Sequence, residues 1–121
     1  MIAFCKPHKI PIVVAGAAGG QIDPSKVQVS DLSQTVQDPL LARLRAVLRR
    51  DHGFPREKKK KFGVIAVYST EPLRYPETAN ACETSDGPAG LNCAGFGSSV
   101  CVTSVFGMVA AAQAINLIAV K

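Results

Sequence analysis

Residues 10–16 have the sequence IPIVVAG, a short apolar run that is rich in β-branched side chains and bounded by proline and glycine. Such a run predicts a strand that is buried on both faces, as in a parallel sheet. Residues 26–30 (KVQVS) and 62–69 (FGVIAVYS) predict two further strands. The turn AGAAGG at residues 15–20 follows the first strand, but its glycine spacing differs from that of a dinucleotide-binding loop.

An amphipathic helix is expected over residues 39–50. Asp38 is a favourable N-cap, Pro39 a favourable first helical residue, and Gly53 a typical helix stop. One stripe of this helix is apolar and consists of Leu40, Leu41, Leu44, Val47 and Leu48. Strands that alternate with helices indicate an α/β fold, which we expect to be a partial doubly wound, mixed sheet.

Residues 94–120 contain no charged side chain. With 27 residues, this segment is long enough to span a bilayer. It is interrupted by glycines and by six polar residues, and a helix that protein covers on all sides has the same composition. We therefore expect a long, buried C-terminal helix rather than a membrane anchor.

The composition is that of a globular protein. The chain has 121 residues, of which 47% are hydrophobic and 19% charged, so we expect a single domain over residues 1–121 and exclude a wholly disordered chain. Its four cysteines form no Cys-x-x-Cys pair, and we therefore predict no metal site. The first ten residues lack the apolar core of a secretory signal, which favours a cytoplasmic protein with reduced thiols.

Positive charge is concentrated in residues 43–61, called here the basic segment. Of a formal net charge of +5, this segment contributes +7 and the rest of the chain −2. Such a block is typical of a protein that contacts a polyanion, although lysine runs also occur in loops that are merely solvated. The nine basic residues are Arg43, Arg45, Arg49, Arg50, Arg56, Lys58, Lys59, Lys60 and Lys61.

Three stretches carry a resemblance to a known family. They are AGAAGGQIDPSKVQVSDLSQTVQDPLLARLR at residues 15–45, YSTEPLRYP at residues 68–76 and GPAGLNCAGFGSSVCVTSVFGMVAA at residues 87–111. Together they resemble the second half of the bacterial tRNA threonylcarbamoyladenosine dehydratases, which are ubiquitin-activating-enzyme-like adenylating enzymes. The resemblance covers essentially the whole chain, and residues 16–45 are its most specific part.

The resemblance implies a definite reaction. Members of the family use ATP and Mg²⁺ to activate the carboxylate of threonylcarbamoyladenosine, next to the tRNA anticodon. Loss of the activated oxygen then closes a ring, which is a net dehydration. Because ring closure is intramolecular, positioning of the substrate can supply much of the rate. With tRNA as the implied partner, the nine basic residues become candidate contacts to its phosphates.

Cys93 is the candidate catalytic residue. It lies where the family has a crossover loop that bears a thiol, and the resemblance implies a nucleophile that accepts the activated acyl group as a thioester. The alternative is a small loop residue, since an intramolecular cyclisation needs no covalent enzyme intermediate. We expect Cys82 and Cys101 to be packing or loop residues.

The nucleotide site of the family lies in its first half, to which this chain has no counterpart. We therefore expect a C-terminal part of the enzyme that binds neither ATP nor Mg²⁺ and is inactive alone. We also expect it to self-associate through surfaces that the first half covers in the parent, which the resemblance implies to be a homodimer. Two other functions remain open: a non-catalytic nucleic-acid-binding module that uses the basic segment, and a small protein that residues 94–120 anchor in a membrane.

Overall fold

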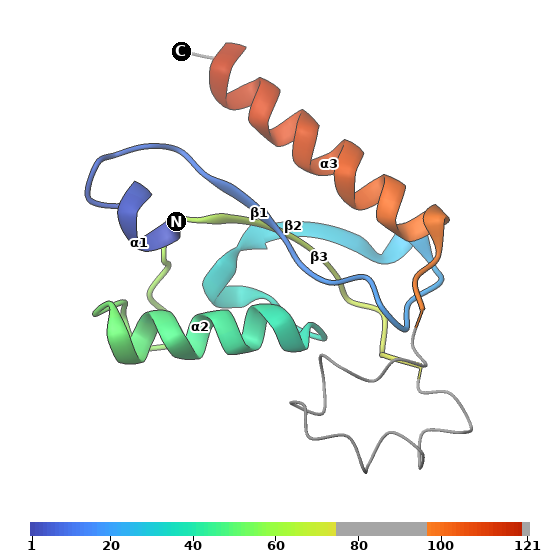
Figure 1. Cartoon of the computed structure of the whole chain (residues 1–121), viewed down its shortest axis with the longest axis horizontal. Coiled ribbons are helices and arrows are strands. Elements are labelled where there is room, and N and C mark those ends of the chain that lie inside the picture. Colours follow the sequence, from blue (N-terminus) through green and yellow to red (C-terminus); the bar gives the residue numbers. More distant parts are fainter. Residues whose placement is uncertain (75–96, 120–121) are drawn as a thin grey trace.

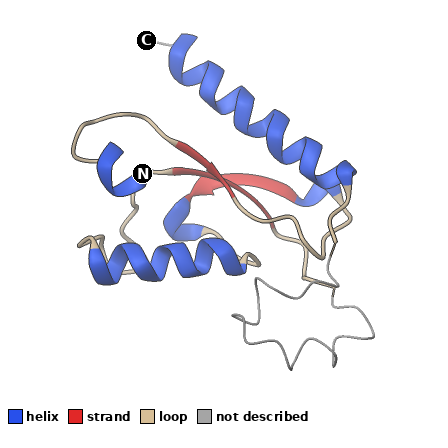
Figure 2. Cartoon of the chain, viewed as in Figure 1, coloured by secondary structure: helices blue, strands red, loops and turns tan. Residues whose placement is uncertain are grey.

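The computed structural model describes residues 1–74 and 97–119. Within them, β1 (Val13–Ala15), β2 (Val27–Asp31) and β3 (Ile65–Ser69) form one sheet in the order β1-β3-β2. β1 runs parallel to β3, and β2 runs antiparallel to it. The expected α/β fold with a mixed sheet is therefore confirmed (Figure 2). All three strands fall inside or within one residue of their predicted ranges.

Helices cover the two faces of this sheet. Helix α2 (Pro39–Asp51) lies on one face and helix α3 (Val100–Ala119) crosses the other (Figure 1). Three short helices complete the described part of the chain: α1 (Ile2–Cys5), η1 (Pro24–Lys26) and η2 (Leu32–Gln34).

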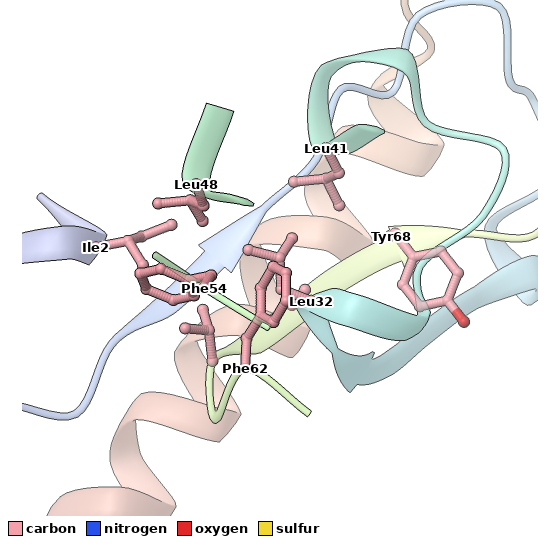
Figure 3. Packing of buried hydrophobic residues seen from close by; sticks show 9 residues of the cluster. Ile2, Leu32, Leu41, Leu48, Phe54, Phe62 and Tyr68 are labelled. Carbon is pink, nitrogen blue, oxygen red and sulfur yellow. The ribbon is translucent and has the colours of Figure 1, made fainter. Parts of the chain in front are cut away.

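The strand β3 supplies both halves of the core because successive side chains point to opposite faces of a sheet. Ala66 and Tyr68 pack with the cluster on the α2 side, where Phe62 and Leu41 are almost completely buried (Figure 3). Val67 packs on the other side, in a smaller cluster with residues of α3. The molecule therefore has three layers, with β3 at their centre.

The strand β1 is shorter and more exposed than predicted. Val13 and Val14 are half-buried, whereas the sequence predicts burial on both faces. The reason is its position: β1 is an edge strand, and none of the described residues pairs with its free side. A continuous apolar run indicates a strand but not whether both of its edges are covered.

The helix α2 follows its prediction closely. The side chain of Asp38 accepts a hydrogen bond from the Leu41 backbone at 3.0 Å, and the helix ends before Gly53, which has a φ of +68°. One residue of the predicted stripe is misplaced, because Leu40 is 39% exposed. Consecutive helical residues are about 100° apart, and a stripe centred on Leu41 leaves its neighbour at the rim.

The expectation that α3 is buried on all sides is wrong for the residues described. Only Val102 and Phe106 are buried, and they face the sheet, whereas Met108 and Ile118 are more than 70% exposed. By length and composition alone, this helix could cross a membrane. Cys101, predicted to be a packing or loop residue, is exposed in its first turn.

Candidate functional site

The basic segment comprises most of α2, from Arg43 onwards, and the loop that follows it. This loop is fixed at several points: the Gln34 side chain donates to the Lys58 carbonyl oxygen at 2.8 Å, and Phe54 and Phe62 anchor it in the core. Most of the basic side chains are exposed, namely Arg43, Arg50, Arg56, Lys58, Lys59, Lys60 and Lys61. The segment therefore presents positive charge on a backbone that the core holds in place.

Two arginines of the segment are half-buried and have internal partners. Arg45 donates to the Thr35 hydroxyl, and burial, followed by the charge of Arg49, lowers the pKa of its guanidinium. Arg49 donates from Nε to the Pro55 carbonyl oxygen at 3.1 Å, and its guanidinium lies 5.1 Å from the centre of the Phe62 ring. Among the nine predicted contacts, Arg45 and Arg49 are therefore two whose side chains the fold itself also uses.

Asp31 fixes the far end of the loop. Its carboxylate accepts hydrogen bonds from the backbone N–H groups of Phe62 at 2.8 Å and Gly63 at 2.7 Å, and from the Ser33 hydroxyl at 2.6 Å. Burial opposes its ionisation, but these hydrogen bonds outweigh burial and lower the pKa of Asp31. The charged side chain of Asp31, the last residue of β2, thus holds the residues that follow the basic segment against the end of β2.

A second candidate site lies at the carboxyl ends of β1 and β3. Because these strands are parallel, residues 16–20 and 70–74 leave the sheet at the same edge, which is where ligands bind in open α/β sheets. Gly20 donates to the Gly97 carbonyl oxygen at 3.2 Å and accepts from the Arg74 backbone at 2.8 Å. These contacts bring the start of α3 to the same edge.

A hollow of about 320 Å³ opens between these segments. Its lining consists of Gly20, Gln21, Ile22, Arg74, Gly97, Ser98 and Ser99. Cys93 and Cys82 lie outside the described residues, so the candidate thiol has no position here. The nearest described residues before and after Cys93, Arg74 and Gly97, both line this hollow.

Glu71 is a buried carboxylate at this edge that the sequence did not single out. It accepts from the backbone N–H groups of Ile22 at 2.9 Å and Asp23 at 2.7 Å, and it pairs with Arg74 at 3.5 Å. Gln21 is 1% exposed, and its side-chain amide donates to the Glu71 carbonyl oxygen at 3.1 Å. Its contacts make Glu71 a clamp between two loops, and an isolated glutamate after a strand gives no hint of such a role.

Asp38 closes the turn after β1. It accepts from the Ala17 backbone at 2.9 Å, and a Cβ atom on Gly16 would overlap its carboxylate. Burial raises the pKa of Asp38, although hydrogen bonds from Leu41 and Ala17 oppose this. The glycine-containing turn is therefore filled by an acidic side chain, an arrangement that repels phosphate. Within residues 1–74 and 97–119, moreover, no group of three or more His, Cys, Asp or Glu side chains could hold a metal ion.

The chain was compared with family models, with curated proteins and with solved structures. No family model matches the chain. It is 47% identical to the tRNA threonylcarbamoyladenosine dehydratase of Haemophilus influenzae over 96% of its length, and 46% identical to that of Escherichia coli over 100%. These alignments cover 44% and 47% of the two relatives, so the chain spans somewhat less than half of each.

The fold agrees with the sequence comparison. Solved structures of the E. coli tRNA N6-threonylcarbamoyladenosine dehydratase in complex with ATP and with AMP each superpose with a TM-score of 0.75 at 44% identity. Each match covers 95% of this chain and 40% of the solved chain. The resemblance inferred from the three sequence stretches is confirmed.

Proposed function

Since the chain is related along almost its whole length to the tRNA threonylcarbamoyladenosine dehydratases, we propose that it supplies the tRNA-contacting part of such an enzyme. The whole enzyme would use ATP to activate the carboxylate of threonylcarbamoyladenosine next to the anticodon and close it into a ring. The observation that carries the proposal is the identity of 46–47% over 96–100% of the chain, together with a basic segment on a fixed backbone.

The described residues do not fit an ATP site. Phosphate binding at the end of a strand needs an open glycine turn that leads into a helix, with N–H groups free to face the ligand. Here the turn after β1 leads into an extended segment and η1, and the Asp38 carboxylate occupies the space beside Gly16. We therefore propose that the whole enzyme binds ATP and Mg²⁺ through residues outside the described part of this chain. This chain would then be one part of a doubly wound fold.

Within this scheme the chain binds and orients the substrate. Phosphate contacts from arginine and lysine fix the register of an RNA and carry little sequence information. The modified nucleoside would lie at the carboxyl ends of β1 and β3, in the hollow that Arg74 and Gly97 line. The thiol of Cys93 remains a proposed nucleophile, with a loop residue of no chemical role as its alternative.

Binding of tRNA to the 121-residue chain is the direct test. We expect salt-sensitive binding, which weakens when Lys58, Lys59, Lys60 and Lys61 are all replaced by glutamine, because each lost phosphate contact reduces counterion release. A control variant removes exposed positive charge elsewhere, with Lys6→Gln, Lys9→Gln and Lys26→Gln. Equal weakening in both variants, or no binding of tRNA at all, would contradict the proposal.

A non-catalytic nucleic-acid-binding module is the second candidate function, and the basic segment alone supports it. Calorimetric titration of Mg-ATP into the chain and into a full-length relative tests where the nucleotide site lies. We expect heat of binding from the relative and none from the chain. A second experiment adds the chain to a relative from which the segment that matches this chain has been deleted. The non-catalytic module is favoured if the chain binds tRNA but does not restore dehydration to that relative.

A further inference from the structure

Three arginines surround a hollow at the end of α2. Its volume is about 310 Å³, and it is lined by Arg49 and Arg50 in the last turn of the helix, by Arg56 in the following loop, and by Ala46. The loop turns back at Gly53, which brings Arg56 to the side of the helix that carries the other two guanidinium groups. The small side chain of Ala46 leaves the space between them open.

Arg49 is held in place before any ligand binds. Its Nε donates to the Pro55 carbonyl oxygen, and its guanidinium lies over the ring of Phe62, which is 1% exposed. Within the described residues, its Nη atoms make no hydrogen bond, so two donor groups in a fixed plane stay available. A guanidinium fixed in this way suits the bidentate recognition of a phosphate.

Arg50 and Arg56 stand on the surface around this fixed group. Arg50 pairs with Asp51 at 3.0 Å, and both side chains are largely exposed, so solvent weakens the pair and a phosphate can exchange with the carboxylate. Glu57 follows Arg56 directly in the sequence. Two carboxylates against three guanidinium groups leave the hollow with net positive charge.

The end of the helix does not cancel this charge. A helix C-terminus carries partial negative charge on its free carbonyl groups. Here the Leu48 carbonyl oxygen already accepts from the backbone N–H groups of His52 at 3.1 Å and Phe54 at 3.2 Å. This capping reduces the field that a bound anion would meet.

We propose that the hollow formed by Arg49, Arg50 and Arg56 binds a single backbone phosphate of the RNA. The inference rests on the proposed tRNA binding and names a defined contact inside the basic segment. Arg49 would be the fixed anchor, whereas Arg50 and Arg56 would close around the phosphate. The lysines that follow would contact neighbouring phosphates less specifically.

The test compares variants that keep Arg49, since its loss would also disturb packing. We expect Arg50→Gln combined with Arg56→Gln to weaken tRNA binding about tenfold and to lower the slope of log affinity against log salt by about one, as for one lost phosphate contact. The control, Lys9→Gln with Lys26→Gln, removes the same charge elsewhere and should change neither quantity. Arg56→Lys should retain the slope but lose affinity, because an ammonium group lacks the bidentate fork.

The outcomes separate this subsite from the proposed function. If the four-lysine variant weakens tRNA binding but the double arginine variant does not, the subsite is wrong and tRNA binding stands. If the unmodified chain binds no tRNA, both fail. Inorganic phosphate should displace tRNA more strongly than chloride at equal ionic strength, and less so in the double variant. Protection of Arg56 from phenylglyoxal by inorganic phosphate but not by tRNA would identify a free-phosphate site and overturn the proposal.

Discussion

Individual carboxylate side chains hold several loops in place by accepting hydrogen bonds from their backbone N–H groups. Asp31 illustrates this because it accepts from Val64 at 3.1 Å as well as from Ser33, Phe62 and Gly63. The sequence shows only an aspartate at the end of an alternating strand. Apart from Ser33, its partners lie about thirty residues away, and no local pattern connects them to Asp31.

We predict that Asp31→Ala lowers the free energy of unfolding by about 2–3 kcal/mol, because hydrogen bonds to a charged acceptor disappear and buried N–H groups lose their partner. Urea unfolding measures the change. Asp51→Ala, which removes an exposed carboxylate, is the control and should leave the urea midpoint nearly unchanged. Similar losses in the two variants would show that Asp31 does not clamp the loop.

Asp31 also predicts a pH dependence. Its pKa is lower in the folded protein than in the unfolded chain, because hydrogen bonds from Ser33, Phe62 and Gly63 outweigh burial. The unfolded chain therefore binds the proton more tightly, and this contribution is complete above the unfolded pKa of about 4 and is lost as the pH falls through the folded pKa. Urea midpoints measured between neutral and acid pH should fall less steeply in Asp31→Asn than in the wild type. An unchanged acid limb would count against this.

At the scale of elements, prediction from sequence succeeded where local chemistry decides the structure. The helix α2 has its cap, its first-turn proline and its glycine stop within the sequence, and each lies where expected. β3 was predicted because an apolar run rich in β-branched residues suits a central strand. The sequence did not predict the exposure of β1 and α3, because the coverage of an apolar surface depends on neighbours that a local pattern does not contain.

The two candidate sites also differ in how far the sequence predicts them. A run of charges is visible in the sequence, whereas the meeting of Gly20, Arg74 and Gly97 depends on the parallel pairing of β1 with β3. Glu71 meets the backbone of Ile22 and Asp23 only because that pairing brings the two loops together. The sequence therefore predicts where positive charge is concentrated, but it does not predict which loops meet at the ends of β1 and β3.

The helix α3 contains a glycine whose replacement by alanine should stabilise the protein. Gly107 lies in the interior of α3, and a Cβ atom added there would meet nothing within 4 Å. We predict that Gly107→Ala raises the free energy of unfolding by about 0.5–1 kcal/mol, because alanine loses less backbone entropy in a helix. Gly53→Ala is the control, since its positive φ should make the same change unfavourable. A loss of stability in Gly107→Ala would contradict this prediction.

The whole molecule has an apolar side that its own described residues leave uncovered. Met108, Ala111, Ile115 and Ile118 recur at helical spacing on the exposed face of α3. An apolar hollow of about 480 Å³ lies between the last turns of α3 and residues 11–13, which lead into β1. An uncovered strand edge and an apolar helix face both favour association with another surface.

We therefore predict that the 121-residue chain self-associates. Sedimentation should give a mass above 12.7 kDa that increases with concentration. Met108→Lys combined with Ile115→Lys should shift the population towards monomer without a change in helix content, because lysine prevents burial of the shared face. Gln28→Lys with Ala42→Lys adds the same charge at other exposed positions and should leave the mass unchanged. A chain that is monomeric at every concentration would contradict the prediction. Flotation with phosphatidylcholine vesicles after a carbonate wash would do so as well, since it would assign the same face to lipid.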